Sequence, residues 1–199
     1  MGKPPPQGGG FLLDPPLGLD PAPKHCKRTM TDVADLISRW QLSPHPEGGW
    51  YREMHRSSDQ VIRADGSQRD GITSILFLLE AGAVSRWHRV RGADEVWIHL
   101  QGAPLELFSL ESTADSPTRT VLTADHPIEA IKANHWQAAR CLGSYTLVSC
   151  CVGPAFDFAD FDMLQDLPQA KTSAGGPQDL SSNAWTAADQ PAPWGAGAS

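Results

Sequence analysis

The sequence contains no apolar run long enough to cross a membrane. A transmembrane helix needs about 20 mostly apolar residues, and no stretch of the 199 residues approaches that length. A secretory signal is not expected at the N-terminus, because the apolar residues 11–13 are followed directly by Asp14 and two prolines. We therefore expect a cytoplasmic protein without a membrane partner.

The sequence also lacks any Cys-x-x-Cys pair, which argues against a zinc ribbon. Its four cysteines are Cys26, Cys141, Cys150 and Cys151. Cys150 and Cys151 are adjacent in an apolar run, where the side chains of a strand alternate between its two faces. We expect buried free thiols, which are typical of a reducing compartment.

Positive charge is scarce. Lysine and arginine number 16 against 23 aspartates and glutamates, which gives a formal net charge of −7. A nucleic-acid partner would usually require a basic face, so this class of partner is not expected. Apolar residues make up 40% of the chain, which is enough for one domain with a hydrophobic core.

The two ends differ in composition from the middle of the chain. Residues 1–29 are rich in proline and glycine, and residues 169–199 are dominated by alanine, glycine, serine and proline. Such segments bury too little apolar surface to offset the entropy lost on ordering. We predict two disordered tails that flank a single domain at residues 30–168.

The pattern of the middle segment predicts one helix followed by strands. Val33, Leu36, Ile37 and Trp40 fall at helical spacing, Thr31 is the expected N-cap, and the helix should end before residues 43–44. The strands are expected at residues 72–79, 95–100, 105–109, 120–122 and 145–152. Short strands separated by turn residues indicate an all-β sandwich or barrel.

One constellation resembles a known motif. Gly82, His88, Glu95 and Gly102 stand at the spacing of the first cupin motif, although Val90 occupies the position where metal-binding cupins usually have a second histidine. The resemblance to the cupin superfamily implies a double-stranded β-helix, or jelly-roll barrel, that is often a homodimer.

Flanking segments resemble one cupin branch in particular. Residues 45–53 read HPEGGWYRE, which is similar to the opening motif of a largely uncharacterised branch. The second cupin motif should fall at residues 132–137, where Lys132 and Asn134 replace proline and glycine and Gln137 stands at the histidine position. Asparagine tolerates the left-handed conformation that glycine would supply there.

The candidate site combines strand alternation with this resemblance. Glu95, Trp97 and His99 share one strand face by alternation. The resemblance implies that His88 and Gln137 lie on facing strands and join them. Polar groups converging on an apolar barrel wall are typical of a site for a small ligand.

The chemistry of this set is open to three interpretations. His88, Glu95 and Gln137 are candidate ligands of a divalent metal ion, although the set is poorer than two histidines and a carboxylate. His88 and Glu95 could instead satisfy each other as a buried pair. In a third interpretation the catalytic residues are His88, as a general base, and Glu95, which sets its pKa and orientation.

Arg52 and Glu53 are candidate substrate-binding residues near the barrel mouth. The segment weakly resembles a stretch of the dTDP-sugar epimerases, which are also cupins, and Arg52 could bind an anionic group bidentately. Because Arg52 and Glu53 are neighbours on an extended segment, their side chains should diverge. His45 and Glu47 are expected to line the entrance.

Three functions remain open from the sequence. The first is an isomerase-like or epimerase-like enzyme acting on a small polar or sugar-derived ligand. The second is a metal-dependent cupin enzyme such as a dioxygenase or lyase. The third is a non-catalytic ligand-binding or storage-like cupin.

Overall fold

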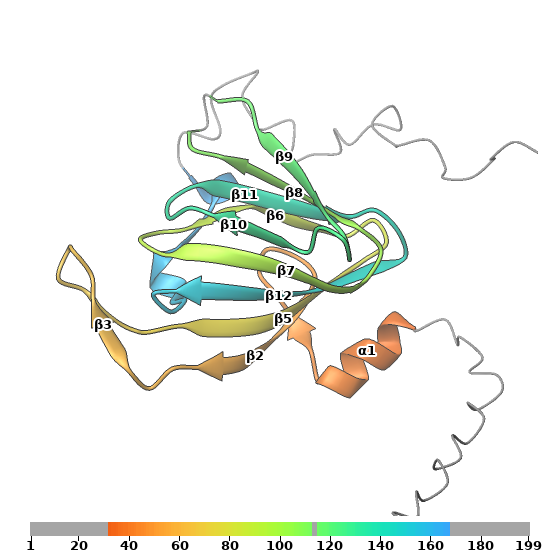
Figure 1. The fold of residues 1–199 in the computed structure, drawn as a ribbon, viewed down its shortest axis with the longest axis horizontal. Helices are drawn as coiled ribbons and strands as arrows, with labels where there is room; N and C mark the ends of the chain where they lie inside the picture. Colours follow the sequence, from red (N-terminus) through yellow and green to blue (C-terminus); the bar gives the residue numbers. More distant parts are fainter. Residues whose placement is uncertain (1–31, 113–114, 168–199) are drawn as a thin grey trace, which may run out of the picture. The chain divides into compact units, whose positions relative to one another are not determined.

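The computed structural model describes residues 32–112 and 115–167. The tails predicted at residues 1–29 and 169–199 lie outside these described residues. The described part is all-β apart from short helical segments, as the sequence pattern predicted. Figure 1 shows its strands forming two sheets of a jelly-roll barrel.

Every strand pairing in the two sheets is antiparallel. The first sheet has the order β1 (Ser43–Pro44), β2 (Trp50–Arg56), β5 (Thr73–Glu80), β12 (Tyr145–Gly153), β7 (Asp94–Gly102) and β10 (Ile128–Ile131). The second has the order β13 (Phe161–Met163), β6 (Val84–Val90), β11 (Trp136–Cys141), β8 (Leu105–Leu110) and β9 (Thr118–Leu122). The predicted strands thus lie within β5, β7, β8, β9 and β12, apart from one residue at the start of the first.

A separate hairpin is inserted in the sequence between two paired strands of the first sheet. Strands β3 (Gln60–Ile62) and β4 (Gln68–Asp70) pair only with each other among the described residues and lie between β2 and β5 in the sequence. The hairpin extends beyond the edge of the barrel in Figure 1.

Helix α1 (Val33–Trp40) packs on the outer face of the first sheet. Leu36 is buried against Leu76 and Leu78, whose side chains point away from the barrel interior. The N-cap is Asp32 and not Thr31, because the Asp32 carboxylate accepts the backbone N–H of Ala34. The predicted helix is therefore present, and its cap lies one residue later than predicted.

The core fills the space between the sheets with alternate residues of each strand. Phe77, Trp97, Leu107 and Val148 belong to one buried cluster inside the barrel. Trp87 and Trp136 instead pack in a second cluster with Leu164, which belongs to the short helix η2 (Leu164–Asp166). These tryptophans are core residues.

A β-bulge in β6 determines which side chains of that strand enter the barrel. Gln137 of β11 pairs with His88 while Ala139 pairs with Ser85, so β6 contains an extra residue between these positions. The bulge shifts the alternation of the strand. Trp87 consequently packs in the cluster with Trp136 and Leu164, whereas His88 is directed into the barrel.

Candidate functional site

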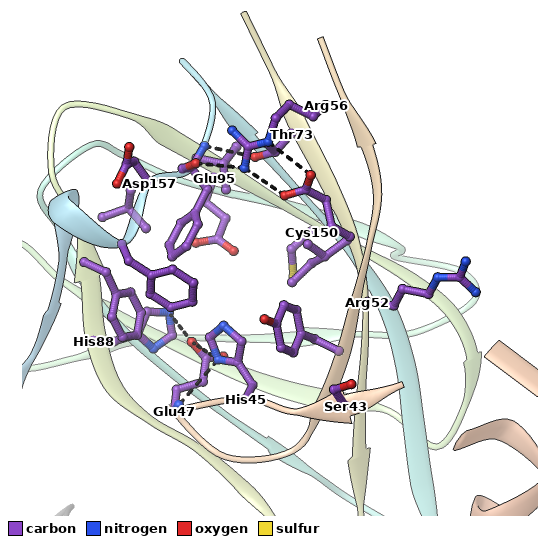
Figure 2. A pocket seen from close by; sticks show the side chains of 18 of the residues that line it. Ser43, His45, Glu47, Arg52, Arg56, Thr73, His88, Glu95, Cys150 and Asp157 are labelled. Atoms are coloured by element: carbon purple, nitrogen blue, oxygen red, sulfur yellow. Dashed lines mark hydrogen bonds and ion pairs between the residues drawn. The ribbon is translucent and has the colours of Figure 1, made fainter. Parts of the chain in front are cut away.

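A cavity of about 530 Å³ opens into the barrel. Its wall combines strands β2, β5, β6, β7 and β12 with the turn before β2 and with residues 156–161, which include the short helix η1 (Phe158–Asp160). The ionisable side chains at its inner end are His45, Glu47, His88 and Glu95. Figure 2 shows His45, Glu47 and His88 gathered in one part of the cavity, with Glu95 and Cys150 in another part of it.

A tight turn inserts Glu47 into the barrel. The backbone N–H of Gly48 donates to the carbonyl of His45, and the N–H of His45 donates to the carbonyl of Gly49. Gly48 and Gly49 have φ angles of 113° and 69°, which favour glycine. A Cβ at Gly48 would lie 2.3 Å from the carbonyl oxygen of Val84, so only glycine lets the turn approach β6 this closely.

The Glu47 carboxyl contacts both imidazoles. Its Oε2 lies 3.2 Å from Nε2 of His88 and 3.5 Å from Nδ1 of His45, while its Oε1 accepts the hydroxyl of Ser85 at 2.8 Å. Burial raises the pKa of Glu47 to about 8, against smaller lowering effects of Ser85 and Arg86. Glu47 therefore holds a proton at neutral pH.

The hydrogen bonds of the imidazoles are consistent with a proton on Glu47. Nδ1 of His88 lies 2.8 Å from the carbonyl oxygen of Arg86, and a carbonyl oxygen only accepts, so Nδ1 bears the hydrogen. Nε2 of neutral His88 is then an acceptor facing Glu47. Burial lowers the pKa of His88 and lowers that of His45 to about 4, so both rings are neutral at pH 7.

Glu95 is the second carboxyl group of the cavity. It is buried on β7, and its Oε2 accepts Nε2–H of Gln137 at 2.5 Å. Burial raises the pKa of Glu95, while His88 and the hydrogen bond from Gln137 act in the opposite direction. The cavity thus contains two carboxyl groups whose pKa values are both shifted towards neutral pH.

The structure corrects the predicted pairing of His88. Both His88 and Glu95 line the cavity and interact electrostatically, but the carboxyl group in direct contact with His88 is that of Glu47. The sequence placed Glu47 at the entrance, whereas its side chain is buried. Nothing in the sequence pattern distinguishes a turn glutamate that enters the barrel from one that faces solvent.

Of the other residues predicted for the site, Arg52 and Glu53 line the cavity, whereas Trp97, Gln137 and His99 do not. Trp97 and Gln137 are fully buried behind Glu95 and hydrogen-bond to each other. His99 does not line the cavity, because its Nε2 lies 3.0 Å from the carbonyl oxygen of Ala103 near the end of β7. Strand alternation for Trp97 and His99, and the motif resemblance for Gln137, did not predict the depth of these residues along the barrel.

Arg52 does not act as the predicted anion clamp in this arrangement. Its guanidinium donates to the carbonyl of Trp40 and is directed away from the cavity in Figure 2. Glu53 instead forms an ion pair at 2.8 Å with Arg56, a residue that the sequence analysis did not name. Arg56 also contacts Asp70 and donates to the carbonyl of Phe156 at the mouth.

Three phenylalanines close the cavity on one side. Phe156, Phe158 and Phe161 make edge-on contacts with one another, and Phe161 also packs against the rings of His45 and His88. All three side chains line the cavity.

The residues predicted as metal ligands do not form a ligand set. Oε1 of Gln137 accepts the indole N–H of Trp97 at 2.9 Å and its Nε2 donates to Glu95, so neither polar atom is free for a metal ion. Within the described residues, no group of three histidine, cysteine or carboxylate side chains is arranged to hold a metal.

Two remaining expectations concern the cysteines and the membrane. Cys150 is a buried free thiol as predicted, whereas Cys151, which was also predicted to be buried, is a free thiol that is only partly buried. Cys141 is a further buried free thiol. Among the helices in the described part of the chain, none is long and apolar enough to cross a membrane.

Comparisons with known proteins support the resemblance found in the sequence. A family model described as "Cupin superfamily (DUF985)" matches residues 34–164. A hypothetical protein from Leishmania major has a similar structure, with a TM-score of 0.61 and 30% identity over 66% of this chain and 86% of that chain. A crystal structure of a protein from Shewanella oneidensis gives a TM-score of 0.60 and 31% identity over 67% of this chain and 85% of that one.

No protein in the search of curated sequences matches the chain. The family model nevertheless covers more than half of the sequence, and the two similar structures agree with it in fold. The chain therefore belongs to the DUF985 family of the cupin superfamily.

Proposed function

We propose that the protein is an isomerase-like or epimerase-like enzyme that binds a small polar, sugar-derived compound in the barrel and moves protons on it. The observation that carries this proposal is the contact of 3.2 Å between Nε2 of His88 and Oε2 of Glu47 inside a cavity that also contains Glu95. Pairs of titratable groups with shifted pKa values in a cleft are typical of acid–base catalysis.

The two carboxyl groups have complementary roles in this proposal. Glu95, in its ionised form, accepts a proton from a carbon atom next to a carbonyl group. Glu47, with His88 as its proton-exchange partner, donates a proton to the carbonyl oxygen. In an isomerisation, Glu95 then returns its proton to the neighbouring carbon and Glu47 regains a proton from the second hydroxyl of the enediol. In an epimerisation, a proton from solvent reaches the same carbon on the opposite face, Glu95 releases its proton to solvent, and Glu47 regains its proton from the enediol hydroxyl. Both routes leave the two carboxyl groups in their starting forms.

The pKa shifts favour such roles at neutral pH. An acid or base works best when its pKa lies near the operating pH. Burial raises the pKa of Glu47 to about 8 and raises that of Glu95. Glu47 can therefore donate a proton at pH 7, and Glu95 is a stronger base than an exposed glutamate.

The direct test is solvent exchange. The protein is incubated in D₂O with a panel of small aldoses, ketoses and sugar acids, and deuterium incorporation next to the carbonyl is followed by NMR. One class of compound should exchange, and His88→Asn and Glu95→Gln should each slow the exchange at least about 100-fold. His126→Asn, at an exposed position, is the matched control.

A different result would favour the non-catalytic alternative. Native mass spectrometry of the purified protein identifies any compound that occupies the barrel. If such a compound binds but exchanges no hydrogen with solvent, the protein is a ligand-binding cupin and the proposed activity is wrong.

A further inference from the structure

We propose that Gln137 and Trp97 are positioning residues that fix Glu95 as the proton acceptor of the cavity. The inference rests on the proposed function in one respect only, which is that a reaction uses Glu95 as its proton acceptor. The geometry that carries it is a buried chain of hydrogen bonds running from the Trp97 indole through the Gln137 amide to Glu95.

The Trp97 indole determines the orientation of the Gln137 amide. The indole N–H of Trp97 is a donor and has no acceptor capacity. It lies 2.9 Å from Oε1 of Gln137, and both side chains are fully buried. If the amide were turned over, its NH₂ would face the indole N–H, and two buried donors would lack acceptors. Trp97 therefore fixes the side-chain oxygen of Gln137 on its own side.

The orientation of the Gln137 amide determines which of its atoms faces Glu95. With its oxygen held by Trp97, Gln137 must present its NH₂ to Oε2 of Glu95, at 2.5 Å. The Cys150 side chain also hydrogen-bonds to Glu95, and burial raises the pKa of this thiol, so it keeps its hydrogen and donates it. Glu95 thus receives hydrogen bonds from two donors, which favours the ionised carboxylate over the acid.

The hydrogen-bond partners of Glu47 differ from those of Glu95. Oε2 of Glu47 faces Nε2 of His88 and Nδ1 of His45. The first of these nitrogens is an acceptor when its ring is neutral, and the second accepts the backbone N–H of Glu47. Glu95 therefore faces two donors, whereas Glu47 faces the Ser85 hydroxyl at Oε1 and two acceptors at Oε2. This difference in partners favours Glu95 as the base and Glu47 as the acid.

The backbone allows this role to be tested without moving the strand. Gln137 pairs with His88 of β6 and with Ser109 of β8 through the β-ladder, which does not depend on its side chain. Gln137→Met keeps the length of the side chain and removes both polar atoms. The groups with electrostatic effects on Glu95 besides Gln137 are His88, Glu47 and Cys150, and all three remain in this variant.

The experiment measures the titration of Glu95 itself. The full chain is labelled with ¹³C at the glutamate side-chain carboxyl and titrated by NMR, and the Glu95 signal is assigned by its loss in Glu95→Gln. A hydrogen bond to a charged group contributes about 1.5–3 kcal/mol, which corresponds to about one to two pH units. Gln137→Met should therefore raise the Glu95 midpoint by about one to two units.

Two further variants complete the test. Trp97→Phe keeps the aromatic ring but removes the indole N–H, so the Gln137 amide is free to turn over. The Glu95 midpoint should therefore rise by less than it does in Gln137→Met. This variant also keeps the proposal testable if Gln137→Met fails to fold. Gln101→Met, at an exposed glutamine, should leave the midpoint unchanged. If Gln137→Met folds and its Glu95 midpoint is unchanged, the inference is wrong. If Gln137→Met does not fold, an unchanged Glu95 midpoint in folded Trp97→Phe has the same meaning. A shifted midpoint in a protein that exchanges no substrate hydrogen would uphold the inference and refute the proposed activity.

Discussion

Nε2 of His88 lies 3.2 Å from Oε2 of Glu47, and both side chains are buried at the inner end of the cavity. His88 belongs to strand β6, whereas Glu47 belongs to the turn that precedes β2. The contact arises because two glycines let the turn approach β6 and because a bulge directs His88 inwards. An imidazole and a carboxyl group are thereby brought together away from water.

The protonation of Glu47 should make stability depend on pH. Its pKa is raised from 4.5 to about 8, so its contribution to stability is fully present below pH 4.5 and is lost as the pH rises through about 8. Between pH 6.5 and 8, wild type should lose up to about 1.4 kcal/mol of unfolding free energy per pH unit relative to Glu47→Gln. His45, whose pKa is lowered to about 4, affects stability mainly below this window.

Urea unfolding at several pH values in this window checks the prediction. Glu111→Gln, at an exposed glutamate, is the control and should follow wild type. A constant difference between wild type and Glu47→Gln across the window would show that Glu47 is ionised throughout.

The turn glycines should be far more sensitive to substitution than an exposed turn glycine. A Cβ at Gly48 would lie 2.3 Å from the Val84 carbonyl oxygen, whereas a Cβ at Gly66 of the β3–β4 hairpin would meet no atom within 4 Å. Both residues have positive φ, so Gly66→Ala should cost about 1–2 kcal/mol from backbone strain alone. Gly48→Ala should cost at least about 2 kcal/mol more, measured by chemical denaturation. Equal losses in the two variants would show that the turn can move away from β6.

Arg56 should hold the phenylalanine segment over the cavity. Its guanidinium donates to the carbonyl of Phe156 and pairs with Glu53 and Asp70. Because these contacts are half-exposed, Arg56→Gln should lower global stability by less than about 1 kcal/mol. It should instead speed amide hydrogen exchange locally, at residues 155 and 156, whose N–H groups donate to Asp70 and Thr73.

Arg52→Gln is the matched control for this exchange measurement. The Arg52 guanidinium contacts Trp40 and is directed away from the cavity, so exchange at residues 155 and 156 should stay at the wild-type rate. If amide exchange at residues 155 and 156 is equally fast in Arg56→Gln and Arg52→Gln, Arg56 does not hold this segment in place.

The charge of the cavity predicts the class of ligand. Four carboxyl groups line it, and its two arginines are held by protein acceptors. A phosphate group would therefore enter without a free cation and near buried carboxyl groups. An uncharged sugar should bind at least about tenfold more tightly than its phosphate ester, which corresponds to about 1.4 kcal/mol. Isothermal titration calorimetry with such matched pairs measures the ratio, and a preference for the phosphate would contradict the prediction.

Much of the fold follows from the local pattern of the sequence. The helical spacing of Leu36 and Trp40 and the alternation along residues 95–100 predict α1 and β7 because each element has its own period. The left-handed conformation expected at Asn134 is found, with a φ of 70°. The cupin fold was predicted from the resemblance of Gly82, His88, Glu95 and Gly102 to the first cupin motif, whose spacing can be recognised in the chain alone.

The sequence by itself thus determined the barrel, the face of Glu95 and the presence of His88 in the site. Only the tertiary structure decided that His88 contacts Glu47, that Gln137 is held between Trp97 and Glu95, and that Arg52 points outwards. The physical reason is that these contacts depend on strand register, on one bulge and on the depth of each residue along the barrel. Such quantities are set by packing between segments distant in the chain, and no local period encodes them.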